Sequence, residues 1–248
     1  MEDKVSVVIP VHNAEKFISE TIKSVREQTY GNFEIILCEN NSDDSTGEIL
    51  SAISDPKIKV LTLTDVEDAA GARNAGVDAA EGRFIAFLDA DDLWKSEKLE
   101  KQIAFMKEKG AKFSFTGYEF ADENAIPNGR IVKVPETITY KEALKNTTIF
   151  TSTVMFDLTL IGKDEIKMPH IKSEDTALWW KILREGNKAF GLNENLTIYR
   201  RPGKSLSSNK FEAIKRIWHL YREWEKLPVL KSAYYFCGWA IRAVLRRI

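Results

Sequence analysis

The chain has 248 residues, of which 44 % are hydrophobic and 29 % charged, and its formal net charge is -1. These values are typical of a soluble globular protein with a large core, and they exclude a disordered chain. The near-neutral charge argues against a nucleic-acid partner. The charge is unevenly distributed, because residues 200–248 contain 12 Lys and Arg against 3 Asp and Glu. This asymmetry favours a basic appendage that either faces an anionic partner or pairs with the acidic body of the same chain.

The sequence begins MEDKVSVVIP, in which a charged start is followed at once by a strand pattern rather than by a secretion signal. No apolar run reaches the ~18 residues that a membrane-spanning helix needs. We therefore expect a cytoplasmic protein, either free or held peripherally on the inner face of the plasma membrane. Cys38 lies within an apolar run and is expected to be a small buried side chain.

The first hundred residues alternate between strand and helix patterns. Apolar runs typical of buried strands occupy residues 4–10, 33–39, 57–63 and 83–89, and helical patterns occupy residues 14–28, 43–54 and 67–82. Strands that alternate with helices predict an α/β fold with a mostly parallel central sheet flanked by helices. The polar clusters VHN, ENNSDD and DADD follow three of these strand patterns. Because ligands of such sheets bind at the carboxyl ends of the strands, we expect a binding site there.

The second half of the sequence is less regular. Strand patterns occupy residues 111–120, 129–135, 151–162 and 196–201, and helical patterns occupy residues 140–146, 173–186, 208–227 and 229–247. We expect residues 1–208 to form one α/β domain and residues 209–248 to form an appendage of amphipathic helices.

Three carboxylates, Asp89, Asp91 and Asp92, stand at the end of the fourth strand pattern. Like charges crowded at this place repel one another unless a cation or a polar ligand compensates them. Mg²⁺ and Mn²⁺ prefer oxygen ligands, and Mg²⁺ usually binds one or two carboxylates together with phosphates and water. The cluster therefore indicates a cation shared with a diphosphate. The structural alternative is a solvated acidic turn that caps the following helix.

Three segments occur in order in the first hundred residues: VSVVIPVHNAEKFISETIKSVREQTYGNFEIILCENNSDDST, GARNAG and FLDADD. In the order and spacing of these segments, the chain resembles the family 2 glycosyltransferases of bacterial surface-polysaccharide type. The resemblance extends from residue 5 to about residue 100, and more weakly to about residue 210. The resemblance implies the GT-A fold and an inverting transfer of a sugar from a nucleotide donor, usually with Mn²⁺ or Mg²⁺. It also implies that residues 1–100 hold the nucleotide sugar and that residues 101–208 lie on the acceptor side.

The resemblance assigns donor-binding roles position by position. Pro10, Val11 and Asn13 match the loop that flanks the nucleotide. Glu39 stands where the family usually has an Asp that accepts a hydrogen bond from the base, and a carboxylate there suits the N3–H donor of uracil. Arg73 is placed to meet the nucleotide or its phosphates, and the alternative is a surface Arg paired with an acid.

The same resemblance assigns the acidic residues. Asp91 is expected to bind the metal directly, while Asp89 is expected to bind the ribose or to assist the metal. Asp92 is interpreted as a favourable start of the next helix. Glu174 and Asp175 match the family's late acidic pair, in which the Asp is the general base that takes the proton of the acceptor hydroxyl. The alternative is that this pair only reflects the preference for acids in a first helical turn.

The segment YRRPGKSLSSNK follows the last strand pattern. By resemblance, Arg201, Lys204 and Ser205 are expected to contact the diphosphate, with which cations form charge-assisted hydrogen bonds. The alternative is a basic loop in solvent. Trp179 and Trp180 either line an acceptor-sugar site or belong to the core.

Residues 229–248 are amphipathic, with Lys231, Arg242 and Arg246 on one arc of the predicted helix. Trp and Tyr beside Arg and Lys suit the surface of a bilayer that carries anionic lipids. The alternatives are a helix packed on its own domain and a helix packed on a second copy in a homodimer.

We therefore predict a metal-dependent transferase that moves a sugar from a UDP-sugar to a hydroxyl of a saccharide or lipid-linked saccharide, in cell-surface polysaccharide or glycan synthesis. No G-x-G-x-x-G follows the first strand pattern, which argues against a dinucleotide-dependent oxidoreductase. No glycine-rich basic loop stands there either, which argues against a nucleotidyltransferase. A non-catalytic nucleotide-sugar-binding or scaffold protein is the alternative, because Asn40 and Asn41 replace the family's more usual Asp-Gly.

Overall fold

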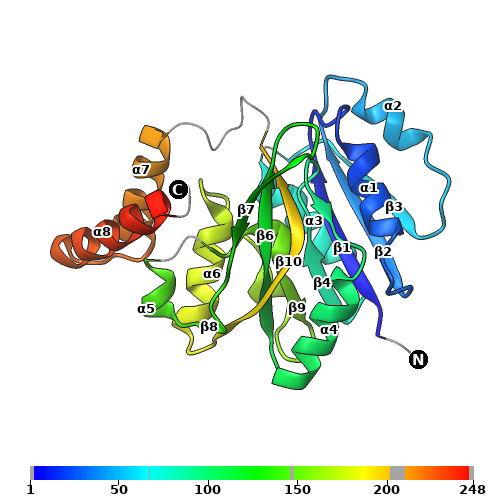
Figure 1. Cartoon of the computed structure of the whole chain (residues 1–248). Helices are drawn as coiled ribbons and strands as arrows, with labels where there is room; N and C mark the ends of the chain where they lie inside the picture. The colour runs from blue at the N-terminus through cyan, green and yellow to red at the C-terminus, as the bar shows by residue number, and fades with distance from the viewer. Residues whose placement is uncertain (1–2, 67, 146–147, 202–209, 246–248) are drawn as a thin grey trace.

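The computed structural model describes residues 3–66, 68–145, 148–201 and 210–245 (Figure 1). These residues form one ten-stranded sheet in the order β3-β2-β1-β4-β9-β6-β10-β5, with β7 beside β6 and β8 beside β10. The strands are β1 (Val5–Val11), β2 (Phe33–Asn40), β3 (Ile58–Leu63), β4 (Phe84–Phe87), β5 (Leu93–Trp94), β6 (Phe113–Ala121), β7 (Pro127–Val132), β8 (Thr137–Ile138), β9 (Met155–Asp157) and β10 (Ala189–Arg200). The helices are α1 (Ile18–Arg26), α2 (Thr46–Ser51), α3 (Ala69–Ala79), α4 (Lys98–Lys109), α5 (Tyr140–Ala143), α6 (Glu174–Arg184), α7 (Lys210–His219) and α8 (Val229–Leu245), with short turns η1 (Thr151–Thr153), η2 (Lys163–Ile166) and the π-helical η4 (Leu220–Trp224).

The N-terminal half of the sheet is parallel. β1 pairs in parallel with β2 and with β4, and β2 pairs in parallel with β3. β9 is antiparallel to both β4 and β6, so β6 again runs in the direction of β4, and β10 is parallel to β6. The predicted α/β fold class is therefore confirmed. The carboxyl ends of β1, β2, β4 and β10 lie at the same edge of the sheet.

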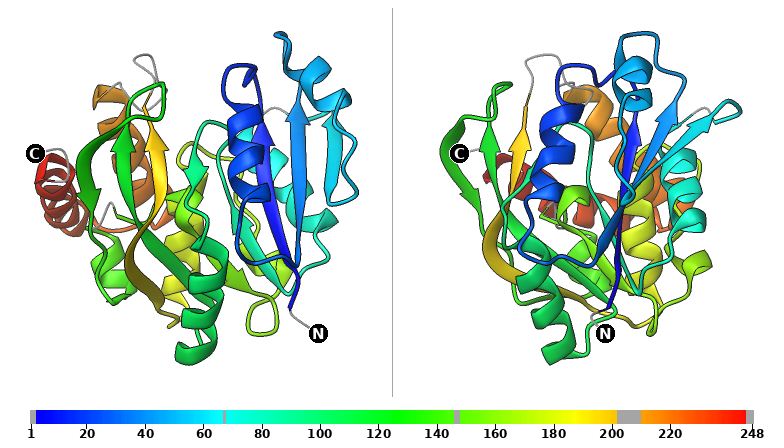
Figure 2. Two further views of the ribbon diagram at one scale, coloured as in Figure 1. Left: turned by 45° about the vertical axis from the view of Figure 1, so that its right-hand side comes forward. Right: turned by 90° about the vertical axis from the view of Figure 1, so that its right-hand side faces the viewer.

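Helices cover both faces of this sheet (Figure 2). Alternate residues of a strand point to opposite faces, so Val7 of β1 belongs to one apolar cluster and Val8 to the other. The first cluster includes residues of α1 and α4, and the second includes residues of α3 and α6. Burial on both faces explains why the parallel strands have continuous apolar sequences. Cys38 is fully buried as predicted, and burial raises the pKa of its thiol to about 12.

Two features of the second half differ from the sequence patterns. The strand pattern at residues 151–162 yields only the short β9, which follows the helical turn η1. The strands β5 and β8 have two residues each, and their short sequences carry no periodic signal. Both pair antiparallel with β10.

The C-terminal appendage consists of α7, η4 and α8 and lies beside α5 and α6 (Figure 1). Trp180 of α6 stacks on Tyr221 of η4 with ring centroids 5.1 Å apart. The hydroxyl of Tyr221 donates a hydrogen bond to the carbonyl of Leu144, next to α5. In the part of the chain that the structure describes, no helix has the length and apolarity needed to cross a membrane.

The close packing of α3 on the sheet gives a stability prediction. A Cβ on Gly76 would lie 2.8 Å from the Sγ of Cys38 and still closer to Val8. Gly76→Ala should therefore lower the free energy of unfolding by about 1–3 kcal/mol, measured by urea denaturation. Gly47→Ala is the matched control, because nothing lies within 4 Å of that Cβ and Ala favours a helix by about 0.5–1 kcal/mol. Equal stability of Gly76→Ala and the wild type would contradict this packing.

Candidate active site

An open pocket of ≈ 560 Å³ lies where the first three parallel strands end. It is lined by His12 after β1, by Asn40 and Asn41 at the end of β2, and by residues 64–66 after β3. The His12 ring nitrogen Nδ1 lies 2.7 Å from the carbonyl oxygen of Asn40, which joins the first two loops. This pocket is therefore at the edge that the sequence predicts for a ligand.

Two asparagines shape the rim of this pocket. Asn13 and Asn41 have φ angles of 50° and 51°, in the left-handed region that Asn tolerates better than most residues. The backbone N–H of Asn13 donates to Ser42 Oγ at 3.1 Å, and Asn13 Oδ1 accepts from the N–H of Asp43 at 2.9 Å. Asn13 thus fixes the two loops against each other.

The other predicted donor-binding residues have different environments. Val11 is 1 % exposed and packs in the core, and Pro10 is half-buried beside it. Glu39 is 8 % exposed, and its Oε1 accepts a 2.7 Å hydrogen bond from the backbone N–H of Ser42. One carboxylate oxygen of Glu39 therefore holds the loop after β2.

The three carboxylates after β4 differ in how their charge is compensated. Asp89 accepts a 2.7 Å hydrogen bond from Arg73. Burial and the neighbouring Asp89 raise the pKa of Asp91 to about 6, although the charge of Arg200 opposes this shift. Asp92 is fully buried, and burial together with Asp91 and Asp89 raises its pKa well above the ordinary value. Negative charge therefore exceeds what nearby cations balance.

The interpretation of Asp92 as the start of the next helix is wrong, because α4 begins only at Lys98. Asp92 instead accepts hydrogen bonds from Ser152 Oγ at 2.5 Å and from the backbone N–H of Arg200 at 3.0 Å. These contacts join the end of β4 to η1 and to the end of β10. Asp92 is therefore a structural acid within the site.

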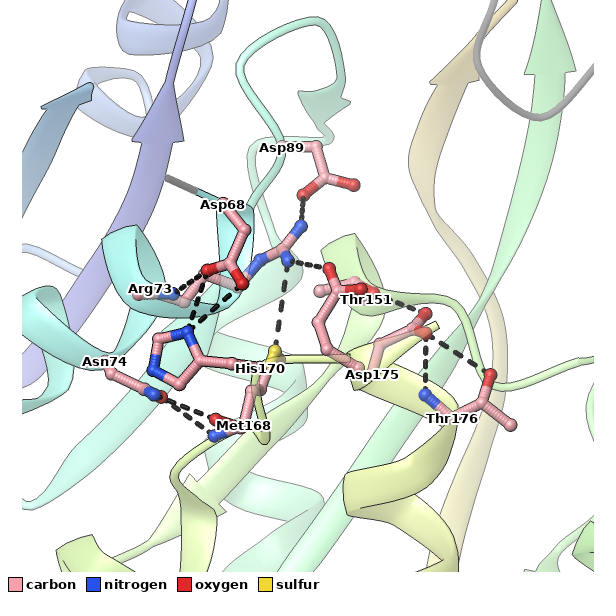
Figure 3. A network of polar contacts seen from close by, with 11 residues as sticks. Asp68, Arg73, Asn74, Asp89, Thr151, Met168, His170, Asp175 and Thr176 are labelled. Carbon is pink, nitrogen blue, oxygen red and sulfur yellow. Dashed lines mark hydrogen bonds and ion pairs between the residues drawn. The ribbon is translucent and has the colours of Figure 1, made fainter. Parts of the chain in front are cut away.

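Arg73 of α3 connects the two halves of the site (Figure 3). Its two terminal nitrogens donate to Asp89 at 2.7 Å and to Glu174 at 2.8 Å, and its side chain is 8 % exposed. Burial lowers the pKa of this guanidinium, but the charges of Asp89 and Glu174 outweigh burial and raise it. Arg73 is thus paired with acids, as the alternative supposed, but it is buried and not at the surface. Among the described residues, its Nε has no hydrogen-bond partner.

Glu174 and Asp175 form the first turn of α6, at the same edge as Asp89. Ser173 turns the chain into the helix with a φ of 62°, and its side chain makes no capping hydrogen bond. Burial and the adjacent Asp175 raise the pKa of Glu174, while Arg73 opposes the rise. Asp175 Oδ2 accepts from Thr151 Oγ1 at 3.1 Å, and its Oδ1 accepts from the backbone N–H of Thr176 at 2.6 Å. The base candidate is therefore held in one orientation.

The segment before α6 is fixed to α3 as well (Figure 3). Asn74 donates to the carbonyl of Met168 and accepts from its N–H, both at 2.8 Å. His170 Nδ1 lies 3.1 Å from both carboxylate oxygens of Asp68, which also caps α3 by accepting from Gly71 N–H at 2.8 Å. The sequence analysis missed Asn74, although it stands beside Arg73 in the ARN motif.

The end of β10 contributes two arginines. Arg200, which the sequence analysis did not assign to the site, is buried, donates to Glu20 at 2.6 Å and lies 4.8 Å from the Phe17 ring centroid. Within the described part of the chain, the Nε of Arg200 has no hydrogen-bond partner. Arg201 is half-buried, with its guanidinium 5.5 Å from the ring centroid of Phe120. The predicted contacts Lys204 and Ser205 lie outside the described residues.

The paired tryptophans of α6 are core residues. Trp179 and Trp180 are 3 % and 1 % exposed. Trp179 packs on Phe113 with ring centroids 5.2 Å apart, and Trp180 stacks on Tyr221. Neither side chain is available to line an acceptor-sugar site.

The donor set after β4 suits a divalent cation that is shared with a phosphate. Across the described ranges, no group of three or more His, Cys, Asp or Glu side chains could hold a metal by itself. Asp89 and Asp91 supply two carboxylates, and Mg²⁺ typically completes such a site with phosphate and water oxygens. Burial and the neighbouring Asp89 raise the pKa of Asp91, so the charged form of this carboxylate is only partly compensated by the chain itself.

Comparison with known proteins gives consistent matches. Residues 6–158 match the family described as Glycosyl transferase family 2. The chain is 42 % identical over 247 residues to "Putative teichuronic acid biosynthesis glycosyltransferase TuaG" of Bacillus subtilis, covering 98 % of this chain and 97 % of the relative. It is 40 % identical over 231 residues to "UDP-Glc:alpha-D-GlcNAc-diphosphoundecaprenol beta-1,3-glucosyltransferase WfgD" of Escherichia coli, covering 93 % of this chain and 90 % of the relative.

Solved structures share the fold at low sequence identity. TarS 1-349 of S. aureus in complex with UDP-GlcNAc has a TM-score of 0.71 at 22 % identity, covering 97 % of this chain and 71 % of that chain. The mannosyltransferase PcManGT of Pyrobaculum calidifontis in complex with GDP-Man and Mn2+ has a TM-score of 0.67 at 18 % identity, covering 98 % and 74 %. The fold is therefore the GT-A fold that the motifs predict.

The raised pKa of Asp91 gives a pH prediction. Because the native state holds this proton up to about pH 6 and an unfolded Asp releases it near 3.8, stability should fall as pH rises through that window. Asp91→Asn removes the proton-binding group and with it this pH dependence. The free energy of unfolding of the variant should therefore rise relative to that of the wild type between pH 4 and 7, by about 1.4 kcal/mol per unit of pKa difference. Urea denaturation without divalent cations measures both free energies.

Ile126→Ser is the control for this measurement, because Ile126 is 62 % exposed and neither side chain titrates. The free energy of unfolding of this variant should differ from that of the wild type by a constant amount over the same pH range. If Asp91→Asn also gives a constant difference, Asp91 does not carry the raised pKa.

Proposed function

Because the chain belongs to glycosyl transferase family 2, we propose that it transfers a sugar from a UDP-sugar to a hydroxyl of a lipid-linked saccharide during synthesis of a cell-surface polysaccharide. The printed names of the relatives TuaG and WfgD support this proposal, since they refer to teichuronic acid and to a UDP-Glc-dependent transfer onto a diphosphoundecaprenol-linked sugar. The reaction takes place on the cytoplasmic side, where nucleotide sugars are available.

The donor nucleotide occupies the pocket at the ends of β1, β2 and β3. By resemblance, Pro10, Val11 and Asn13 flank the nucleotide, and His12, which stands among them, lines the pocket. Glu39, whose Oε1 is engaged by Ser42, has its second oxygen available for the N3–H of uracil. Residues 1–100 therefore act as the donor-binding half, and residues 101–208 as the acceptor half.

The diphosphate lies between the acids after β4 and the cations at the end of β10. Asp91, assisted by Asp89, would hold Mn²⁺ or Mg²⁺, and the bound ion would neutralise charge on the departing diphosphate. Arg201 adds positive charge from the end of β10. By resemblance, Lys204 adds a second cation from the segment that follows, and Ser205 adds a hydroxyl that can donate a hydrogen bond to the diphosphate. Arg73 acts through the two acids it holds, because both terminal nitrogens of its guanidinium are already engaged.

Asp175 is the general base. It removes the proton of the acceptor hydroxyl while that oxygen bonds to the anomeric carbon and the bond to the diphosphate breaks, which inverts the configuration at that carbon. Thr151 and the N–H of Thr176 orient its carboxylate. Glu174 is a positioning residue, since Arg73 ties it to Asp89 on the donor side.

The observation that carries this proposal is the double ion pair of Arg73. Glu174 lies 101 positions further along the chain than Arg73, and yet its carboxylate accepts a hydrogen bond from the same guanidinium that donates to Asp89. The acceptor-side acids and the donor-side acids are thereby brought to one edge of the sheet. A non-catalytic binding protein has no need for this second acidic pair.

Asp175→Asn should lower kcat by about 10²–10⁴ and leave UDP affinity within about twofold of wild type, since only the proton acceptor is lost. UDP release from a UDP-sugar and a lipid-linked acceptor measures the rate, and calorimetry measures the affinity. Asp164→Asn, at an exposed carboxylate, should keep full activity. A wild type without any UDP release would favour the non-catalytic alternative, and an unaffected Asp175→Asn would remove the base assignment.

UDP and Mn²⁺ together should raise the Tm more than either does alone, because both bind the native state at adjoining places. Stabilisation of about 2.7 kcal/mol is expected when a ligand is present at a hundredfold excess over its Kd. Asp91→Asn should abolish the part of the shift that depends on Mn²⁺ and preserve a smaller shift with UDP. An unchanged Tm with both ligands would overturn the donor and metal assignments.

A further inference from the structure

The outer face of α8 carries apolar side chains that no other part of the described chain covers. Leu230, Tyr234, Ile241 and Val244 are 85 %, 62 %, 61 % and 58 % exposed, and Cys237 is also exposed. Their spacing of three and four residues places them on one side of the helix. We refer to these five residues as the apolar stripe. Large side chains exposed in one line are unusual on a monomer and indicate a binding surface.

A basic row runs along one flank of the apolar stripe. Lys231 and Arg242 of α8 are exposed, and Lys145, at the end of α5, lies between them. The Cδ of Lys145 would lie 2.8 Å from a Cβ on Gly238, so its stem crosses α8 at this glycine. Its Nζ lies 3.2 Å from Tyr234 Oη, and Arg242 donates to its backbone carbonyl at 3.2 Å.

The charges of this basic row are not balanced by an ion pair. None of the ion pairs between described residues includes Lys145, Lys231 or Arg242. Glu142 of α5 is within electrostatic reach of Arg242, but its carboxylate accepts hydrogen bonds from the N–H and the hydroxyl of Thr139. The row therefore presents net positive charge beside an apolar surface.

We propose that the apolar stripe and the basic row form a docking surface for a bilayer that contains anionic lipids. Apolar side chains enter the acyl boundary, while Lys and Arg meet the headgroups and Tyr234 sits at the interface between them. This inference deepens the proposed function and rests on it in one respect, since a lipid-linked acceptor brings its sugar to the membrane surface.

A second copy of the chain is the less favourable occupant. In an antiparallel two-fold contact between two α8 helices the same patch meets itself, and the two basic rows lie on the same side and would approach each other. Like charges brought together in this way repel, whereas an anionic surface attracts the row and covers the stripe at the same time.

Vesicle sedimentation of the full chain tests the proposal without any sugar substrate. Wild-type protein should bind vesicles of phosphatidylcholine with about one third phosphatidylglycerol, and should bind pure phosphatidylcholine at least tenfold more weakly. Lys231→Glu with Arg242→Glu should weaken binding to the anionic vesicles by more than about 25-fold, since each basic residue contributes roughly fivefold. Leu230→Ser with Ile241→Ser should weaken it at least about tenfold.

Ile126→Ser with Ile131→Ser is the matched control, because these side chains are 62 % and 50 % exposed and lie just before and within β7, outside α7, η4 and α8. This variant should bind vesicles as the wild type does. Wild-type protein that ignores anionic vesicles would overturn the proposal. So would a dimer, seen by analytical ultracentrifugation, that Leu230→Ser with Ile241→Ser dissociates. Vesicle binding by a protein without transferase activity would refute the proposed function and leave the docking surface intact.

Discussion

The ion pairs of Arg73 are the constraint on which the site depends. One buried guanidinium donates to Asp89 at the end of β4 and to Glu174 at the start of α6. Burial of charged groups is costly, and a buried ion pair is tolerated only when its geometry is good on both sides. Without this cation, two groups of acids would face each other across the edge of the sheet. Arg73 therefore links the first turn of α6 to the end of β4.

The three carboxylates after β4 differ in how completely other groups of the chain compensate their negative charge. Asp89 has a full ion pair, and Asp92 has two hydrogen bonds in a fully buried position. Asp91 has a hydrogen bond from its own backbone and the charge of Arg200, and its pKa is still raised. Compensation is thus incomplete at the residue expected to bind a metal. Natural proteins place destabilising groups chiefly at functional sites. The incompletely compensated carboxylate of Asp91 lies where a divalent cation, bound together with a diphosphate, would supply positive charge.

The sequence predicts well whatever depends on local patterns. Continuous apolar runs identify β1, β2 and β4, and the polar residues that follow them lie at the common edge because parallel strands end there. Asp92 and Arg200 were not predicted correctly, because their roles follow from contacts 108 positions apart in the chain. Asn74 escaped notice for the same reason, since its partner Met168 is 94 positions away. The tryptophans of α6 are ambiguous in sequence, and only packing assigns them to the core.

The helix α6 links the chemistry to the proposed docking surface. Its first turn carries Glu174 and Asp175, and its middle carries Trp180, which stacks on Tyr221 of the appendage. Arg184 at its end pairs with Glu225 at 3.1 Å, and Glu225 also accepts a hydrogen bond from Tyr140 of α5. Lys145, which follows α5, belongs to the basic row on α8. The appendage is therefore anchored to the element that orients the base, so that a membrane held by α8 would have a fixed position relative to Asp175. A lipid-linked sugar needs such a fixed relation, because its reach from the bilayer is limited by the length of its own headgroup.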